Sequence, residues 1–148
     1  MADQIRASSV RFFLSDVKKN IPVGTGFLVS DNAVLSCAHV VADALGLPEI
    51  APDIPKDAVL RLDFPLVAPG QVLTAHVIRW LPIRPDGRGD IALLQLDSNP
   101  TDGTEAVRLV MTENLWSHNF RAFGFPAGRD EGVWASGKML ERQAIDWV

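Results

Sequence analysis

Short apolar runs separated by turn-forming residues are the feature of this sequence that most limits its possible folds. The runs are rich in Val, Leu, Ile and Phe, and Gly, Pro, Asp or Asn bounds most of them. This punctuation is typical of an all-β sandwich or barrel. The predicted strands are Val10–Leu14, Gly26–Ser30, Ala33–Ser36, Ala58–Phe64, Val72–Trp80, Ile91–Leu96 and Asn119–Phe125.

The segments between these strands predict one short helix and several turns. Ala38–Leu45 has helical character and is ended by Gly46 and Pro48. Further prolines make residues 47–57 a loop. Asp31–Asn32 predicts a tight hairpin turn, because Asn tolerates positive φ. The 148 residues suffice for one ordinary domain and are too few for two complete ones.

Composition and charge exclude several classes of function. Hydrophobic residues make up 47% and charged residues 22%, so a buried core is expected. The net charge of −4 gives no electrostatic basis for a nucleic-acid partner. Neither a secretory signal at Met1–Gln4 nor a membrane-spanning apolar run is present, so we expect no membrane partner. The single cysteine, Cys37, fits a reducing compartment, and we therefore expect a cytoplasmic location.

Three segments carry the residues suited to chemistry. Residues 23–29 contain two glycines, which permit close backbone approach where a strand enters a packed barrel. In residues 34–41 a strand ends and a helical turn begins at His39. In residues 89–96 an aspartate, Asp90, directly precedes an apolar strand. The sequence therefore offers one imidazole and one carboxylate at the ends of regular elements.

An imidazole and a buried carboxylate together suit acyl transfer at neutral pH. The reaction needs a base with a pKa near 7, for which histidine is the natural candidate. A carboxylate bonded to the far ring nitrogen holds one tautomer and stabilises the imidazolium. Asp90 suits this role because the strand after it anchors it at the edge of the core. His39 suits the role of base because a strand-to-helix corner presents its side chain to a cleft.

These motifs together resemble one peptidase family. The order Gly-Thr-Gly-Phe (24–27), Leu-Ser-Cys-Ala-His-Val-Val (35–41) and Gly-Asp-Ile-Ala-Leu-Leu (89–94) is similar to the trypsin-like, chymotrypsin-fold serine peptidases, closest in style to bacterial members and the HtrA-type branch. The resemblance implies that His39 is the general base and that Asp90 orients it. It also implies protein or peptide substrates and no cofactor.

The resemblance extends to the end of the chain and implies a domain plan. Residues 123–128 and 133–140 are similar to the opening of the family's second barrel. The expected fold is all-β, with an antiparallel Greek-key barrel in residues 1–112. Residues 113–148 would then hold a linker and the incomplete start of the second barrel. A second chain or a downstream domain is expected to complete that barrel.

The family's serine nucleophile has no counterpart in these residues. It lies in a Gly-Asp-Ser-Gly or Gly-x-Ser-Gly loop, which the sequence lacks. Only Ser136 is followed by glycine, and its Trp134-Ala135 context matches the first strand of the second barrel instead. The missing loop also builds the oxyanion hole in this family. We therefore predict that this chain, truncated before the serine, has no peptidase activity by itself.

Two functional classes remain open. One is a serine endopeptidase whose nucleophile lies outside these residues, which the paired His39 and Asp90 favour. The other is a degenerate peptidase acting as a protein-binding or regulatory module, which the absent serine favours. The coding sequence beyond Val148 would distinguish them.

The remaining candidate residues are interpreted as structural. His76 lies in a predicted strand and His118 in a polar linker, and Cys37 is predicted to be a small buried hydrophobic residue. A metal site from Cys37, His39, His76, His118 and Asp90 is possible on composition. No spacing matches a zinc motif, so we predict no metal.

Overall fold

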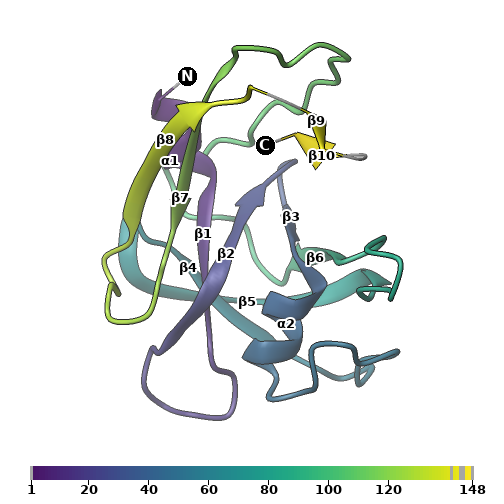
Figure 1. Cartoon of the computed structure of the whole chain (residues 1–148). Coiled ribbons are helices and arrows are strands. Elements are labelled where there is room, and N and C mark those ends of the chain that lie inside the picture. The colour runs from purple at the N-terminus through teal and green to yellow at the C-terminus, as the bar shows by residue number, and fades with distance from the viewer. Residues whose placement is uncertain (1, 141, 144–145, 148) are drawn as a thin grey trace.

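Six antiparallel strands close into a barrel that forms the first part of the molecule (Figure 1). The computed structural model describes residues 2–140, 142–143 and 146–147. The strands are joined in the order β1-β2-β3-β6-β5-β4, which confirms the expected Greek-key barrel. Their bounds are β1 (Ser9–Phe13), β2 (Pro22–Leu28), β3 (Ala33–Ser36), β4 (Leu60–Phe64), β5 (Ala68–Leu81) and β6 (Ile91–Leu96).

Alternate residues of these strands fill the barrel. The side chains of Val10, Phe12, Leu62 and Leu94 are completely buried and belong to one continuous apolar cluster. Because successive residues of a strand point to opposite faces, each strand contributes every second residue to the interior. Burial of one such side chain stabilises the fold by about 1.5 to 3 kcal/mol. The apolar runs of the sequence therefore account for the barrel core.

Two glycines in β2 allow the neighbouring elements to pack against it. A Cβ atom at Gly24 would lie 2.6 Å from a methyl carbon of Val40 in the helix above. A Cβ atom at Gly26 would lie 2.7 Å from the carbonyl oxygen of Leu35 in β3. Both separations are too short for any larger residue without movement. The expectation of close backbone approach at these glycines is confirmed.

Helix α2 (Ala38–Ala44) follows β3 directly and agrees with the predicted helical segment. Its Val41, Ala42 and Ala44 side chains are fully buried, so the helix is fixed to the barrel along that face. Helix α1 (Ala2–Ser8) was not expected, because seven residues carry too little periodicity to recognise. No helix among the described residues is long and apolar enough to cross a membrane.

Three local expectations need correction. Strand β2 begins at Pro22, four residues earlier than predicted, because proline is tolerated as the first residue of a strand. Strand β5 begins at Ala68, since its register with β4 continues past a bulge near Phe64. The Asp31–Asn32 connection exists between β2 and β3, but neither residue has positive φ.

A separate two-stranded hairpin follows the barrel. It consists of β7 (Asn119–Gly124) and β8 (Val133–Lys138), and the short pair β9 (Arg142–Gln143) and β10 (Asp146–Trp147) lies beyond it. Most residues of the hairpin are exposed, unlike those of the first barrel. This arrangement agrees with the opening strands of a second barrel. The boundary between residues 112 and 113 remains a prediction.

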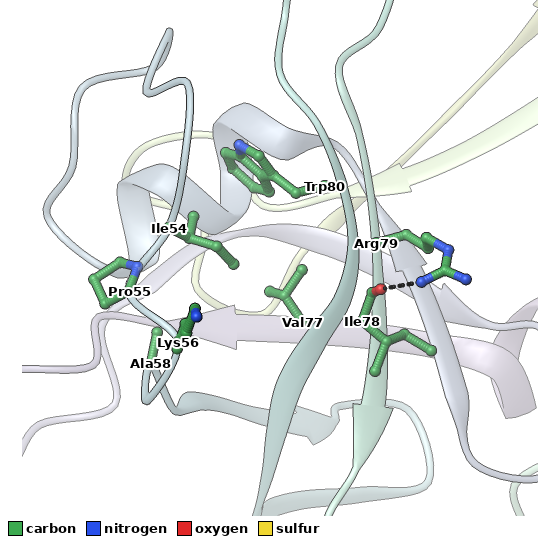
Figure 2. Close-up of a pocket in the computed structure, with 8 residues that line it drawn as sticks. All are labelled: Ile54, Pro55, Lys56, Ala58, Val77, Ile78, Arg79 and Trp80. Atoms are coloured by element: carbon green, nitrogen blue, oxygen red, sulfur yellow. Dashed lines mark hydrogen bonds between the residues drawn. The ribbon is translucent and has the colours of Figure 1, made fainter.

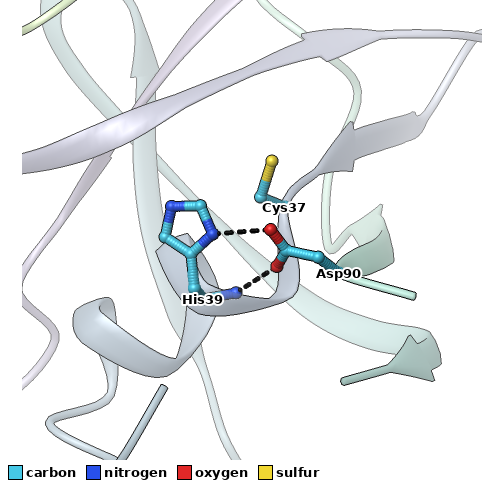
Figure 3. Close-up of side chains that lie close together, drawn as sticks. All are labelled: Cys37, His39 and Asp90. Carbon is cyan, nitrogen blue, oxygen red and sulfur yellow. Dashed lines mark hydrogen bonds and ion pairs between the residues drawn. The ribbon is translucent and has the colours of Figure 1, made fainter. Parts of the chain in front are cut away.

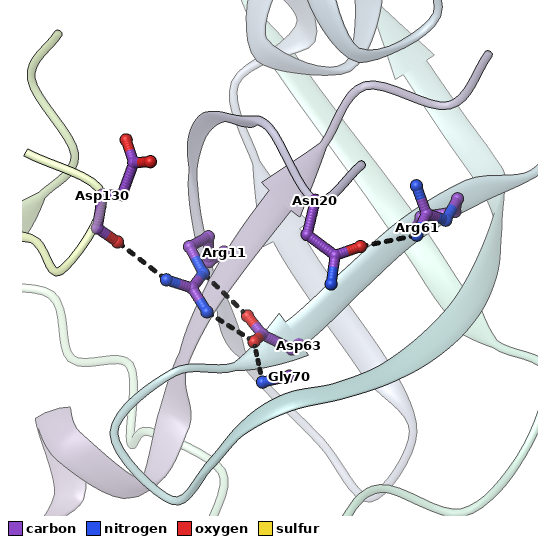
Figure 4. A network of polar contacts seen from close by, with 6 residues as sticks. All are labelled: Arg11, Asn20, Arg61, Asp63, Gly70 and Asp130. Carbon is purple, nitrogen blue, oxygen red and sulfur yellow. Dashed lines mark hydrogen bonds and ion pairs between the residues drawn. The ribbon is translucent and has the colours of Figure 1, made fainter. Parts of the chain in front are cut away.

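A buried ion pair joins the barrel to this hairpin (Figure 4). The Arg11 guanidinium donates to both carboxylate oxygens of Asp63, at 3.0 and 2.6 Å, and the Asp63 side chain is completely buried. The Gly70 backbone N–H donates to the same carboxylate at 2.7 Å. The other arm of Arg11 donates to the Asp130 carbonyl oxygen in the β7–β8 loop at 2.7 Å. Arg11 therefore ties β1, β4 and the hairpin loop together.

Candidate active site

His39 lies in the first turn of α2, where the chain leaves the barrel. Strand β3 ends at Ser36 and the helix begins at Ala38, so the direction of the chain changes sharply just before His39. The buried face of α2 packs against the barrel and fixes this corner in place. The His39 side chain is 40% exposed, which leaves the imidazole open to a ligand.

Asp90 sits in a strained turn that ends directly before β6. Its φ of +61° is in the left-handed region, and Gly89 before it has a φ of +85°. A Cβ atom at Gly89 would lie 2.2 Å from the Pro82 carbonyl oxygen, so only glycine fits. Sequence analysis quoted Gly89 as part of the motif but missed this positioning role. The sequence signal that could have revealed this role is the glycine immediately before the candidate carboxylate.

The two side chains meet as the sequence predicts (Figure 3). His39 Nδ1 lies 2.8 Å from Asp90 Oδ2, and the His39 backbone N–H donates to Asp90 Oδ1 at 2.9 Å. A carboxylate can only accept hydrogen bonds, so Nδ1 carries the proton in the neutral ring. This leaves Nε2 with a lone pair directed away from Asp90, which is the arrangement a general base requires.

The environment of Asp90 keeps its carboxylate ionised. Burial raises the pKa of Asp90. The hydrogen bonds from the His39 backbone and ring, together with the His39 charge, lower this pKa by more than burial raises it. The net effect places the pKa of Asp90 below its ordinary value. The carboxylate is therefore charged at neutral pH and can stabilise a positive charge on the neighbouring ring.

Cys37 lies beside this pair, and its predicted burial is wrong. The side chain is exposed because residue 37 precedes α2 outside the barrel, whereas Val34 of β3 is completely buried. Partial burial and the negative charge of Asp90 raise the pKa of the Cys37 thiol. The thiol is therefore protonated at neutral pH and is not an activated nucleophile.

Apolar hollows lie beside Asp90 and along β2. One hollow of about 270 Å³ is lined by Phe27, Leu35, Cys37, Asp90 and Ile91, among others. A second, of about 390 Å³, shares Thr25, Gly26 and Phe27 with the first and extends to Leu109 in the linker and Phe123 in β7. The two neighbouring hollows, called the groove along β2 below, share residues 25–27 and together reach from the Asp90 turn to the β7–β8 hairpin.

A further hollow lies between β5 and the loop before β4, and it includes neither His39 nor Asp90 (Figure 2). Ile54, Val77 and Trp80 gather in it, and the Trp80 indole N–H donates to the Ala51 carbonyl oxygen at 3.1 Å. Arg79 turns away and donates to the Ile78 carbonyl oxygen. This hollow contains no pair of groups suited to proton transfer, so the candidate active site lies elsewhere.

A second histidine–aspartate pair lies on the barrel surface. His76 Nδ1 is 2.8 Å from Asp97 Oδ1, and the Thr74 hydroxyl donates to Asp97 Oδ2 at 2.7 Å. Hydrogen bonds from Thr74 and His76 lower the pKa of Asp97. His76 is 48% exposed and lines none of the hollows described above. Its geometry resembles that of the His39 pair, but Asp97 lines none of these hollows, whereas Asp90 lines one.

The position of Ser136 does not suit a nucleophile. It lies in the middle of β8, paired with Arg121 of β7. Within residues 4–140, whose side chains are described, no serine hydroxyl is hydrogen-bonded to His39. The structure therefore brings His39 and Asp90 together without a serine.

Comparison of the sequence with known families matches this arrangement. The family model described as a trypsin-like peptidase domain matches residues 24–146, which include all three motifs. The chain belongs to this trypsin-like peptidase family. No curated protein matches the sequence.

Solved structures confirm the trypsin-like fold at low sequence identity. The chain resembles the scabies mite inactivated protease paralogue S-D1 (TM-score 0.65, 12% identity), covering 95% of this chain and 60% of that one. It also resembles the MamO protease domain of Magnetospirillum magneticum (TM-score 0.60, 18% identity), covering 97% of this chain and 66% of that one. A serine endoprotease from Yersinia pestis is similar too (TM-score 0.56, 16% identity), and the match covers 98% of this chain and 46% of that one. The chain thus spans about half to two thirds of these proteins.

Proposed function

We propose that this chain supplies the base and its orienting carboxylate to a serine endopeptidase. In the complete enzyme, His39 Nε2 takes the proton from a serine hydroxyl as that oxygen attacks the peptide carbonyl. Asp90 holds the ring in the productive tautomer and stabilises the imidazolium. The serine and the oxyanion hole come from a Gly-x-Ser-Gly loop outside these residues. The substrate is a protein or peptide.

The observation that carries this proposal is the double contact between the two residues. Asp90 accepts from both the ring and the backbone N–H of His39, at 2.8 and 2.9 Å. The second contact fixes the carboxylate relative to the start of α2, so the ring has one preferred orientation. A histidine that only filled space would not need a carboxylate held in a strained left-handed turn.

We also propose that the 148-residue chain is inactive alone and acts in the cytoplasm. The groove along β2 is open, and Leu109 is exposed within it. A second barrel, supplied by a downstream segment or another chain, would cover this surface and place the serine near Nε2. Without it, neither a nucleophile nor an oxyanion hole stands beside His39 in the described residues.

The second candidate function is a non-catalytic binding or regulatory module. The similar scabies mite protein is named an inactivated protease paralogue, so the fold also occurs in chains that bear that description. In such a module the open groove, rather than His39, would engage the partner. The His39–Asp90 contact would then have no role in function.

Activity of a completed barrel tests the proposal. The chain is compared with a fusion in which a second-barrel segment carrying a Gly-x-Ser-Gly loop follows Val148, both incubated with unfolded protein substrates. We expect cleavage by the fusion only. Asp90→Asn should reduce kcat by about 10⁴-fold, because the ring then favours the wrong tautomer.

A matched control separates the active-site pair from the surface pair. Asp97→Asn removes the carboxylate beside His76 at the same 2.8 Å separation and should leave cleavage unchanged. A folded fusion that reacts with a serine-directed fluorophosphonate but cleaves equally well with His39→Ala would refute the proposed base. A fusion that folds and binds peptides without cleavage would favour the binding module.

A further inference from the structure

Three donor groups of different chemistry lie close together, with the Cys37 sulfur directed away from the other two (Figure 3). The Sγ atom of Cys37, a ring nitrogen of His39 and a carboxylate oxygen of Asp90 all lie within 4.8 Å of one another. They come from the end of β3, the start of α2 and the turn before β6, so the barrel holds all three in place. Their sequence spacing matches no zinc motif, and for this reason sequence analysis predicted no metal.

We propose that Cys37, His39 and Asp90 bind a Zn²⁺ ion. Thiolate, imidazole and carboxylate are the three ligand types that zinc takes in proteins, and a site with three protein ligands keeps a fourth position for water. A hollow of about 270 Å³ lined by Cys37 and Asp90, but not by His39, adjoins the three donors and leaves room for this water. The binding inference is independent of the proposed peptidase function.

Zinc binding requires two changes in the geometry of the site. With bonds of about 2.0 to 2.3 Å, two ligand atoms of a tetrahedral zinc lie on the order of 3.3 to 3.8 Å apart. His39 Nδ1 and Asp90 Oδ2 lie 2.8 Å apart in a direct hydrogen bond, so an ion bound by both would replace this bond and move the two atoms apart by on the order of 0.5 to 1 Å. The Cys37 sulfur lies within 4.8 Å of the other two donor atoms, and rotation of its exposed side chain would bring it to the ion.

Zinc binding changes which ring nitrogen of His39 carries the proton. Zinc bonds to Sγ and to Nδ1, the S–H and Nδ1–H bonds break, and Nε2 takes up a proton because a neutral imidazole ligand keeps one N–H. One proton is released to solvent for each ion. Nε2 then has no lone pair, so His39 cannot act as a base. On the proposed function, zinc is therefore an inhibitor of the complete peptidase.

Titration of the 148-residue chain tests the site without any substrate. Zn²⁺ binding is measured by calorimetry, and Cd²⁺ binding by the ultraviolet thiolate-to-cadmium charge-transfer band. This band reports on Cys37 directly, because the chain has one cysteine. We expect one ion per chain. Cys37→Ser and His39→Ala should each weaken zinc binding by about tenfold or more, since each removes one of three ligands.

His76→Ala is the matched control, because the His76–Asp97 pair has the same 2.8 Å separation but, among the residues that the structure describes, belongs to no three-donor cluster. It should leave the affinity unchanged. Binding that ignores Cys37→Ser or His39→Ala, or that is lost in His76→Ala, overturns the site. A cadmium titration of the unsubstituted chain without a thiolate band also overturns it, whether or not the variants fold. Failure of the fusion to cleave peptides would refute the peptidase proposal and leave this result untouched.

Discussion

Gly89→Ala should separate Asp90 from His39 while Gly87→Ala should not. Both glycines have positive φ, +85° at Gly89 and +79° at Gly87, so alanine is strained at either position. Only Gly89 is also crowded, since its added Cβ would lie 2.2 Å from the Pro82 carbonyl oxygen. At Gly87 nothing lies within 4 Å of the added atom. The pair of variants therefore isolates the effect of the clash.

The size of the effect follows from these separations. The left-handed backbone costs an alanine about 1 to 2 kcal/mol in both variants. To reach 3.0 Å, below which real Cβ atoms essentially never lie, the Gly89 backbone must move by about 0.8 Å. A movement of that size along the hydrogen bond would lengthen the 2.8 Å contact between His39 and Asp90 to about 3.6 Å, which no longer counts as bonded. Strain of this kind adds about 1 to 3 kcal/mol.

Two measurements compare the Gly89→Ala and Gly87→Ala variants. Urea unfolding monitored by tryptophan fluorescence should show a larger loss of unfolding free energy for Gly89→Ala than for Gly87→Ala. The His39 Nδ1–H proton should be visible by NMR in Gly87→Ala and lost in Gly89→Ala, because only a hydrogen bond protects it from exchange. Equal stability losses with the His39 proton retained in both variants would refute the role assigned to Gly89.

Two further predictions concern buried and ionised carboxylates. Asp63→Ala leaves the Arg11 guanidinium mostly buried without its partner, and should lower the free energy of unfolding by about 3 to 5 kcal/mol in urea denaturation; a loss below 1 kcal/mol would contradict this. Because the folded-state pKa of Asp90 is lowered, its stabilising contribution is fully present above the unfolded-state pKa of about 3.9 and is lost as the pH falls through the folded-state value. Asp90→Asn should therefore flatten the acid limb of the stability–pH curve, and an unchanged acid limb would show that the contact contributes nothing.

The barrel was predictable because its signals are local. Apolar runs such as Ile91–Leu96 are bounded by turn residues, and alternate side chains of these runs fill the core. The bounds of β2 and β5 were less accurate, because pairing with neighbouring strands extends both beyond their apolar residues. Helix α1 has no periodic signal at its length, and it contacts distant residues, as where the Glu105 backbone N–H donates to the Ala7 carbonyl oxygen at 3.2 Å.

The candidate site was predictable in identity but not in its surroundings. His39 and Asp90 stand in motifs that resemble a known family, and the structure places them in contact. The exposure of Cys37 depends on its place at the start of α2, and the groove along β2 depends on how the hairpin packs against the barrel; no local pattern records either. The Arg11–Asp63 pair joins residues 52 positions apart and likewise has no sequence signal.

The tautomer of His39 tests most directly whether Asp90 orients it as a base. Long-range ¹H–¹⁵N NMR of the ring distinguishes protonation at Nδ1 from protonation at Nε2 in the neutral form. We expect the proton on Nδ1 in the unsubstituted chain and a shift of population to Nε2 in Asp90→Asn. A neutral ring protonated mainly at Nε2, unaffected by Asp90→Asn, would contradict the account.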